Sequence, residues 1–150
     1  MAEERQQQGG TPGQPRRVII AGYGIPGRFV AEFCDRHGIR YVVIERNPTI
    51  VLRCQRGGTL IVEGDSRDAQ TLRDAGIDEA TDIAITLPDD IAVLDTIATA
   101  RRIKPSIRII ARATFVSQGM EAARRGADDV VVAEQVVAEE FARQIEKALR

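Results

Sequence analysis

The sequence of 150 residues predicts an α/β fold: one Rossmann-like domain with a doubly wound parallel sheet of about six strands and helices on both faces. Three observations predict this fold class. Short runs rich in Val and Ile alternate with longer amphipathic segments along the chain. Several of these runs are almost continuously apolar, which is typical of strands covered on both faces. The first run ends in three glycines directly before a segment with helical periodicity.

The expected elements follow a polar N-terminal segment. Residues 1–16 are rich in Gln, Gly, Pro and charge, so we expect a disordered tail there and a single folded domain over residues 17–150. The expected strands cover residues 17–21, 41–44, 59–62, 82–86, 107–111 and 129–132. The expected helices cover residues 26–36, 48–55, 68–75, 89–103, 114–125 and 134–149.

Residues with special backbone preferences support these boundaries. Pro26 and Pro48 fit the first turn of a helix, and Asp68 and Asp89 are suited to cap helix N-termini. Glycines follow several expected helix ends, where a left-handed conformation is needed: Gly38, Gly57, Gly76 and Gly126.

Composition excludes several classes of protein. The formal net charge is -1, so no general positive field favours nucleic acid. With 1 histidine, and with Cys34 and Cys54 far apart, no zinc site is expected. No stretch approaches the roughly 20 apolar residues that a membrane-spanning helix needs. We therefore expect a cytoplasmic protein without a metal site and without direct membrane insertion.

The glycines of the first strand–helix junction have the spacing Gly-x-Gly-x-x-Gly and predict a nucleotide-binding loop. Gly22 would allow the tight turn, Gly24 would leave room for a diphosphate, and Gly27 would let the helix pack closely on the strand. The N-terminus of that helix offers free N–H groups to an anion. The remaining candidates near this loop are Tyr23, Ile25 and Arg28.

Acidic and polar residues after the next two strands complete the predicted site. Glu45 ends the second strand roughly 20 residues after the glycines, where a carboxylate binds both ribose hydroxyls and repels a 2′-phosphate. NADP is therefore disfavoured, although Arg46 beside it leaves that alternative open. Asp65 and Ser66 follow the third strand and are expected near the adenine. Leu87, after the fourth strand, is expected to form an apolar wall of the same crevice.

Each of these candidates has a plainer alternative. Glu45 could be a solvated strand end, Asp65 a turn residue, and Arg28 an ordinary surface residue. Arg112, at the end of the fifth strand, could line the crevice or face solvent. His37 precedes a glycine at a helix end and is interpreted as a terminal cap.

The inventory of reactive groups argues against catalysis. A short-chain dehydrogenase needs a Tyr with a Lys four residues later, but Gly27 follows Tyr23 at that distance and Glu45 follows Tyr41. His37 is expected at the end of the sheet opposite the crevice. We therefore expect no catalytic residue.

Several segments together resemble one known family. GYGIPGRF, VVIERNP, LIVEGDSRDAQTLRDAGIDEATDIAITLPDD and GADDVV are similar to the N-terminal domain of the regulator-of-potassium-conductance family, also called RCK-N, TrkA-N or KTN. The resemblance runs from about Arg17 to the last helix. It implies phosphate binding by Gly22, Gly24 and Gly27, ribose binding by Glu45, and adenine contacts from Asp65 and Ser66. Ile25 and Pro26 stand where members often carry an arginine, so terminal-phosphate contact would fall to Arg28.

The resemblance also implies a function. Members bind NAD(H), AMP, ADP or ATP and assemble as dimers or rings beneath a potassium channel, a potassium uptake system or a cation–proton antiporter. The chain is therefore expected to be a regulatory module at the inner face of the plasma membrane, held there by a transporter subunit. The alternative is an NAD-dependent oxidoreductase or its cofactor-binding fragment. A nucleotide-free scaffold is a third hypothesis.

Two helices independently predict an assembly. The helix over residues 89–103 carries one apolar stripe with Ile91, Leu94 and Ala98 and another with Val93, Ile97 and Ala100. One stripe is expected on the sheet and the other at a subunit interface. The last helix has a stripe of Val137, Phe141, Ile145 and Leu149, which would either close the core or cross to a partner in a homodimer.

Overall fold

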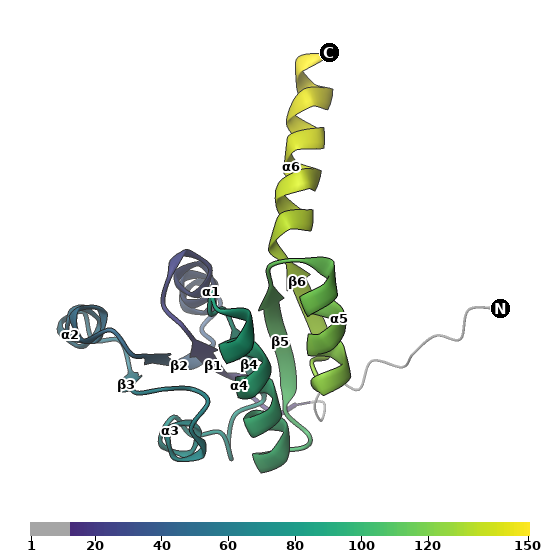
Figure 1. Cartoon of the computed structure of the whole chain (residues 1–150). Helices are drawn as coiled ribbons and strands as arrows, with labels where there is room; N and C mark the ends of the chain where they lie inside the picture. Colours follow the sequence, from purple (N-terminus) through teal and green to yellow (C-terminus); the bar gives the residue numbers. More distant parts are fainter. Residues whose placement is uncertain (1–12) are drawn as a thin grey trace.

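A computed structural model describes residues 13–150 and contains a six-stranded sheet in the order β3-β2-β1-β4-β5-β6 (Figure 1). Every pair of neighbouring strands is parallel. The strands are β1 (Arg17–Ala21), β2 (Arg40–Glu45), β3 (Ile61–Glu63), β4 (Asp82–Ile85), β5 (Arg108–Ala113) and β6 (Asp129–Val132). The strand order reverses between β1 and β4, which is the doubly wound arrangement predicted from the sequence.

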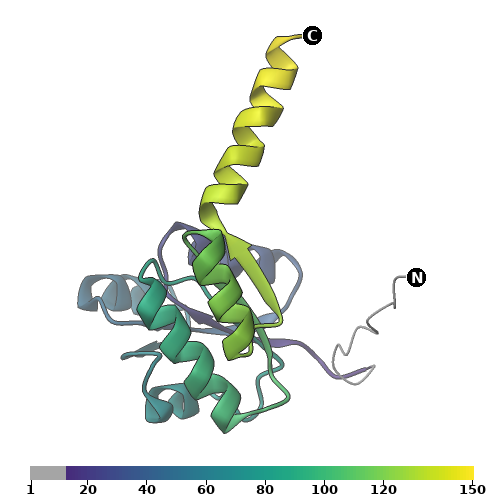
Figure 2. The same ribbon diagram turned by 45° about the vertical axis from the view of Figure 1, so that its right-hand side comes forward.

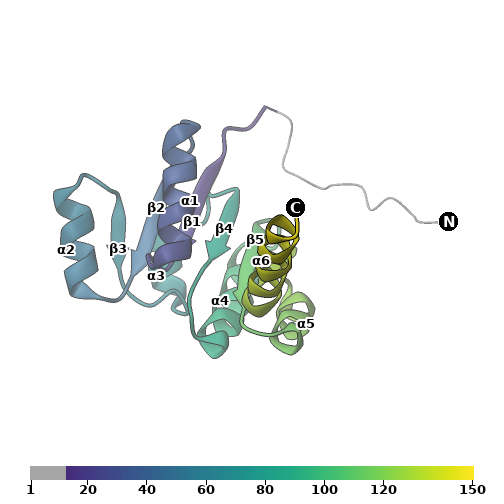
Figure 3. The same cartoon turned by 90° about the horizontal axis from the view of Figure 1, so that it is seen from above.

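Helices connect all the strands and the last helix follows β6. They are α1 (Ile25–Arg36), α2 (Pro48–Arg56), α3 (Ala69–Asp74), α4 (Asp90–Ile103), α5 (Val116–Arg125) and α6 (Ala133–Ala148). The view from above shows α1 and α2 on one side of the sheet and α4 and α5 on the other (Figure 3). The predicted elements are therefore all present, with ends displaced by a few residues.

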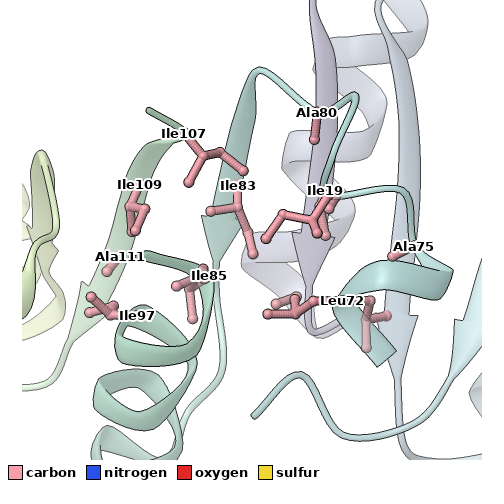
Figure 4. Close-up of a cluster of buried hydrophobic side chains, with 14 of the residues drawn as sticks. Ile19, Leu72, Ala75, Ala80, Ile83, Ile85, Ile97, Ile107, Ile109 and Ala111 are labelled. Carbon is pink, nitrogen blue, oxygen red and sulfur yellow. The ribbon is translucent and has the colours of Figure 1, made fainter. Parts of the chain in front are cut away.

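Two hydrophobic clusters lie on opposite faces of the sheet, because successive residues of a strand point to opposite sides. The larger cluster includes Ile19 and Ile83, and its side chains pack against α3 and α4 (Figure 4). Ile97 of α4 is 0% exposed, which confirms that one predicted apolar stripe of this helix covers the sheet. The smaller cluster contains Ile20, Ala31 and Val43 beneath α1.

The face of the sheet beside α1 is left partly open at β5 and β6. Along β5, buried residues alternate with half-buried ones, so only one of its faces is fully covered. On β6, Val131 is 48% exposed. Parallel sheets are normally covered on both faces. This half of the sheet therefore lacks a layer that a complete doubly wound domain would have.

The last helix does not supply that layer. α6 projects away from the domain in both side views (Figures 1 and 2), and none of its residues is buried. Phe141 is 69% exposed and Leu149 83% exposed. Of the two roles predicted for this stripe, closure of the core is therefore wrong for the single chain. No helix in residues 13–150 is long and apolar enough to cross a membrane.

Some local predictions need correction. Gly57 has a φ of -81°, and its neighbour Gly58 adopts the left-handed conformation instead, with a φ of 79°. Asp89 caps α4 through a bond from the Ala92 N–H, but the Asp68 side chain makes no capping bond to α3.

The expected tail at residues 1–16 falls largely outside the described residues. At its described end, the Arg16 guanidinium donates two hydrogen bonds of 2.9 Å to the Asp82 carboxylate. Asp82 opens β4 and is 7% exposed, so this pair satisfies a nearly buried charge. Arg16 is thus joined to the folded domain.

Candidate functional site

The loop between β1 and α1 lies at the carboxyl end of the sheet, beside the point where the strand order reverses. Gly22 has a φ of 99°, a conformation that favours glycine, and its N–H donates to the Ile44 carbonyl of β2 at 2.9 Å. From β4, the Thr86 hydroxyl bonds to the carbonyls of Ala21 at 3.1 Å and Gly22 at 3.0 Å. Neighbouring strands on both sides therefore hold this loop in place.

The other two glycines of the loop have different physical roles. A Cβ on Gly27 would lie 2.0 Å from the Gly22 carbonyl oxygen, so only glycine permits this contact between helix and strand. A Cβ on Gly24 would meet nothing within 4 Å. Gly24 is the N-cap of α1 and has no side-chain cap, and the first turn has no acidic residue. Pro26 has no N–H and the Arg28 N–H bonds to the Gly24 carbonyl at 3.0 Å, so the N–H groups of Ile25 and Gly27 are those of this turn that remain for an anion.

Glu45, at the end of β2, joins this loop to the next one. Its Oε2 accepts the Tyr23 N–H at 2.9 Å, and its Oε1 accepts the N–H groups of Arg46 at 2.9 Å and Asn47 at 3.0 Å. These bonds fix the carboxylate at the mouth of the crevice. A carboxylate has about four acceptor sites. Three of these sites are used, so Glu45 can accept one further hydroxyl donor without releasing the loop.

The loops after β2, β3 and β4 enclose a crevice of about 200 Å³. Its lining includes five residues predicted from the sequence: Glu45, Arg46, Asp65, Ser66 and Leu87. The structure thus brings together side chains that are far apart in the chain. None of the three loop glycines lines the crevice, but Gly22 lies against Leu87, one of its lining residues. At the carboxyl ends of the strands, the crevice has the position expected for a nucleotide in an open parallel sheet.

Charged pairs surround Asp65 in this crevice. Arg67 Nη2 lies 2.7 Å from its Oδ2, and Arg46 Nη1 lies 3.6 Å from the same oxygen. The hydrogen bonds from the Arg67 side chain lower the pKa of Asp65, so this residue is ionised at neutral pH. Asp65 therefore serves as a hydrogen-bond acceptor in the crevice.

Ser66 occupies the crevice wall differently from the prediction. It is 3% exposed, and its Oγ lies 2.9 Å from Thr96 Oγ1 in a buried bond to α4. The hydroxyl is thus directed to the helix behind the crevice. A contact between this hydroxyl and an adenine stays a prediction, and it would require the bond to Thr96 to break.

Two further predicted residues line a different cavity. Tyr23 and Arg28 border a space of about 280 Å³ together with residues of α2. Because Arg28 is absent from the lining of the crevice, a contact with a nucleotide phosphate stays a prediction. Ile25 is 72% exposed at the start of α1, in an apolar row with Phe29 and Phe33.

Three residues that support the site were not predicted. Thr86 holds the glycine loop, Thr96 binds Ser66, and the Thr99 hydroxyl donates to the Arg67 carbonyl at 2.9 Å. The signal for the pair on α4 was two threonines three residues apart, on the same side of a helix with apolar stripes. Buried hydroxyls require partners, so such residues indicate a polar contact across the helix face.

Other parts of the described structure do not form a competing site. A cavity of about 680 Å³ lies at the amino ends of β1 and β2, opposite the crevice. His37 is the C-cap of α1, and its Nδ1 lies 2.8 Å from the Phe33 carbonyl oxygen, as expected for a terminal cap. Arg112 donates to the Pro88 carbonyl at 3.2 Å beside the crevice. Within residues 13–150, no group of His, Cys, Asp or Glu side chains is suited to hold a metal ion.

Comparisons with known proteins agree with this geometry. The TrkA-N domain family matches residues 18–133. Over 121 residues the chain is 30% identical to YbaL of Escherichia coli K12, provisionally named a cation/proton antiporter, covering 81% of this chain and 22% of YbaL. Over 119 residues it is 29% identical to KefB of Alkalimonas amylolytica, provisionally named a K(+) efflux antiporter, covering 79% of this chain and 18% of KefB. The chain spans about a fifth of the length of these curated relatives.

Solved structures show the same arrangement. The TrkA-N domain of the inner membrane protein YbaL from Escherichia coli has a TM-score of 0.80 at 29% identity, covering 91% of this chain and 98% of that one. The GsuK channel bound to NAD has a TM-score of 0.79 at 31% identity, covering 91% of this chain and 24% of GsuK. GsuK has also been solved bound to ADP, with the same TM-score of 0.79 and 31% identity over 90% of this chain and 35% of that one.

Substitution of Gly27 and of Gly24 by alanine is expected to affect the stability of the fold to different extents. We expect Gly27→Ala to lower the free energy of unfolding by about 1–3 kcal/mol or more, because the new Cβ overlaps the Gly22 backbone. Gly24→Ala is expected to change it by less than about 0.5 kcal/mol, since its Cβ enters open space and its φ is -76°. Urea unfolding measures both. Equal losses in the two variants would contradict the packing role of Gly27.

Proposed function

Because the chain belongs to the TrkA-N domain family, we propose that it is a regulatory nucleotide-binding module that controls a membrane transport protein for potassium or another monovalent cation. The ligand is NAD(H) or an adenine mononucleotide: AMP, ADP or ATP. The observation that carries this proposal is the crevice at the carboxyl end of the sheet, where the glycine loop and Glu45 lie side by side. The relatives named as antiporters and the nucleotide-bound GsuK structures support it.

Each part of the crevice fits one part of an adenylate. The open N–H groups at the start of α1 would bind the phosphates, and the lack of a side chain at Gly24 would let them approach. Glu45 would accept one ribose hydroxyl on its free lone pair and a second in place of one of its three backbone bonds, and Leu87 would pack against the base. A 2′-phosphate would lie against the Glu45 carboxylate, so NADP would bind more weakly than NAD.

Binding would also change how the loops are held together. The glycine loop, Glu45 and the loop after β3 each follow a different strand, and a nucleotide would bridge all of them. A ligand shifts a conformational equilibrium only by its different affinity for the two states. We propose that the nucleotide favours one arrangement of these loops and of the helices attached to them, and that the transport protein senses this arrangement.

A melting-temperature panel tests the nucleotide site. We expect at least one of AMP, ADP, ATP, NAD and NADH to raise the melting temperature of the wild-type protein, because a ligand that binds only the folded state stabilises it. Gly24→Ala should abolish this shift while leaving the ligand-free melting temperature unchanged. Glu45→Gln should reduce the shift with NAD and narrow the difference between NAD and NADP, because the repelling charge is gone.

Arg56→Gln is a suitable control, since Arg56 is exposed at the end of α2 and lines neither the crevice nor the adjoining cavity. It should retain the wild-type shifts. A Gly24→Ala variant that binds every nucleotide as the wild type does would show that the phosphates lie elsewhere.

We propose that the module is not an enzyme, in contrast to the oxidoreductase alternative. His37 caps a helix at the amino edge of the sheet, and the Lys104 Nζ donates to the backbone carbonyls of Asp78 and Ala80 at 2.8 and 2.6 Å. Neither residue faces the crevice as a proton donor. We expect purified protein with NADH to show no enzyme-dependent loss of absorbance at 340 nm with a panel of aldehydes and ketones. Turnover with any of them would favour the oxidoreductase.

We propose further that the module forms a homodimer through α6. The exposed apolar stripe of α6 and the open face at β5 and β6 each lack a covering layer, and a two-fold arrangement would let α6 of each copy cover the other. The row of Ile25, Phe29 and Phe33 on α1 adds to this apolar surface. Such a dimer would sit at the inner face of the plasma membrane, held by the transport protein.

Matched substitutions test the role of α6. Phe141 and Leu60 are each 69% exposed, but Leu60 lies on the loop before β3, away from α6. We expect Phe141→Asp to convert the dimer into a monomer in sedimentation-velocity analysis, because burial of a charge at an apolar interface costs several kcal/mol. Leu60→Asp should remain dimeric. A wild-type monomer at high concentration, or loss of the dimer in both variants, would contradict the proposal.

A further inference from the structure

A second cavity lies beside the glycine loop, between α1 and α2, and it is separate from the crevice. Its volume is about 280 Å³. The side chains of Tyr23, Arg28, Arg53 and Cys54 contribute to its lining, and none of them lines the crevice. The proposed nucleotide site does not account for this space.

Two positive charges converge on this cavity. Burial, and after it the Glu45 carboxylate, raise the pKa of the Cys54 thiol above its ordinary value, whereas Arg53 and Arg28 act to lower it. Both guanidinium groups therefore lie within electrostatic range of one sulfur atom. Within residues 13–150, Arg28 and Arg53 form no ion pair and donate no side-chain hydrogen bond. Arg67, which lines the crevice, is instead paired with Asp65 at 2.7 Å.

The third polar group of the cavity is also a donor. Burial raises the pKa of Tyr23, so its phenol keeps its proton at neutral pH. Nearby carboxylates do not fill the acceptor role. Glu45 directs its oxygens to backbone N–H groups, and Asp35 accepts the Tyr41 hydroxyl at 3.1 Å. Glu32 also acts on Tyr23 from α1 but has no bond to it. The cavity thus presents three donors and lacks a matching acceptor.

We propose that this cavity binds a small oxyanion, a phosphate group, held by Arg28 and Arg53 with the Tyr23 hydroxyl as a further donor. Planar guanidinium groups match the geometry of phosphate oxygens and bind them with charge-assisted hydrogen bonds. A volume of about 280 Å³ accommodates a phosphate with its first waters.

Tyr23 connects this cavity to the crevice. Its ring lines the cavity, while its backbone N–H donates to Glu45 at 2.9 Å. An anion that holds the Tyr23 side chain would therefore steady the loop and carboxylate that face the ribose. The anion would act as an effector of the nucleotide site, with a coupling that is reciprocal. Only this coupling rests on the proposed function; binding of the anion does not.

The phosphate could be free or could be carried by a nucleotide, and one experiment separates these sources. Melting temperatures are measured for the wild type, Arg53→Gln and Arg56→Gln with sodium phosphate against sodium chloride at equal ionic strength. Arg56 is on the same helix but does not line the cavity, so it controls for net charge. Phosphate stabilises many proteins by exclusion from their surfaces. The informative quantity is therefore the difference between the two variants.

For free phosphate, we expect a saturable rise in melting temperature for the wild type and Arg56→Gln, and an apparent affinity about ten-fold or more weaker for Arg53→Gln. If the site instead binds a phosphate that is part of a nucleotide, inorganic phosphate has no specific effect. Arg53→Gln then weakens binding of NADP, which carries a 2′-phosphate, but not of NAD. If Arg53→Gln and Arg56→Gln behave alike in every arm, the anion site is wrong.

The same data keep the two proposals apart. A phosphate effect that depends on Arg53, in a protein that no nucleotide stabilises, would contradict the proposed function and support the anion site. Nucleotide binding without any Arg53-dependent effect of phosphate or NADP would support the proposed function and contradict the anion site. Arg53→Lys retains the charge without the planar fork and is expected to fall between the wild type and Arg53→Gln.

Discussion

The contact between Gly27 and the Gly22 carbonyl sets the position of α1 over the sheet, and the rest of the site depends on it. No side chain fits between these two backbones. Because the helix lies this close, its first N–H groups open directly above the end of β1. The hydrogen bond from the Gly22 N–H to the Ile44 carbonyl, and the one from the Thr86 hydroxyl to the Gly22 carbonyl, then hold the loop against the sheet. The anion-binding end of α1 is thus built from backbone geometry and needs no charged side chain.

Glu45 extends this backbone arrangement into a rigid rim. Three N–H groups from two loops converge on one carboxylate, so the end of β2 and the glycine loop move as a unit. In the loop after β3, Asp65 forms ion pairs with Arg46 and Arg67. The neighbouring Ser66 hydroxyl is hydrogen-bonded to the Thr96 hydroxyl of α4. The crevice on one side of this rim is lined by carboxylates paired with arginines, whereas Arg28 and Arg53 line the cavity on the other side. The rim therefore lies between two cavities with different charged groups.

The sequence predicted the elements and the glycine loop well, because both depend on local patterns. Alternation of apolar runs and helical segments predicts a doubly wound parallel sheet once right-handed crossovers are assumed. The third glycine of such a loop allows the helix to pack closely on the strand, and Gly27 has this role here. Contacts across the fold could not be predicted in this way. The partner of Ser66 is 30 residues away on α4, and nothing in the motif after β3 indicates which way the hydroxyl turns. Arg28 was placed by its distance from the loop, but the rotation of α1 directs it to α2. For α6, periodicity identified an apolar stripe but not what would cover it.

All strands run the same way, and this gives the last helix a particular position. α6 leaves β6 at the carboxyl end of the sheet, where β1 also continues into the glycine loop, and the Glu134 N–H bonds to the Thr114 carbonyl after β5. The N-terminus of α6 thus lies at the carboxyl end of the sheet, while its C-terminus extends well beyond the domain (Figure 2). A small rotation at the start of α6 therefore becomes a large displacement at its C-terminus. The start of α6 lies at the same end of the sheet as the crevice, with β5 between β6 and β4.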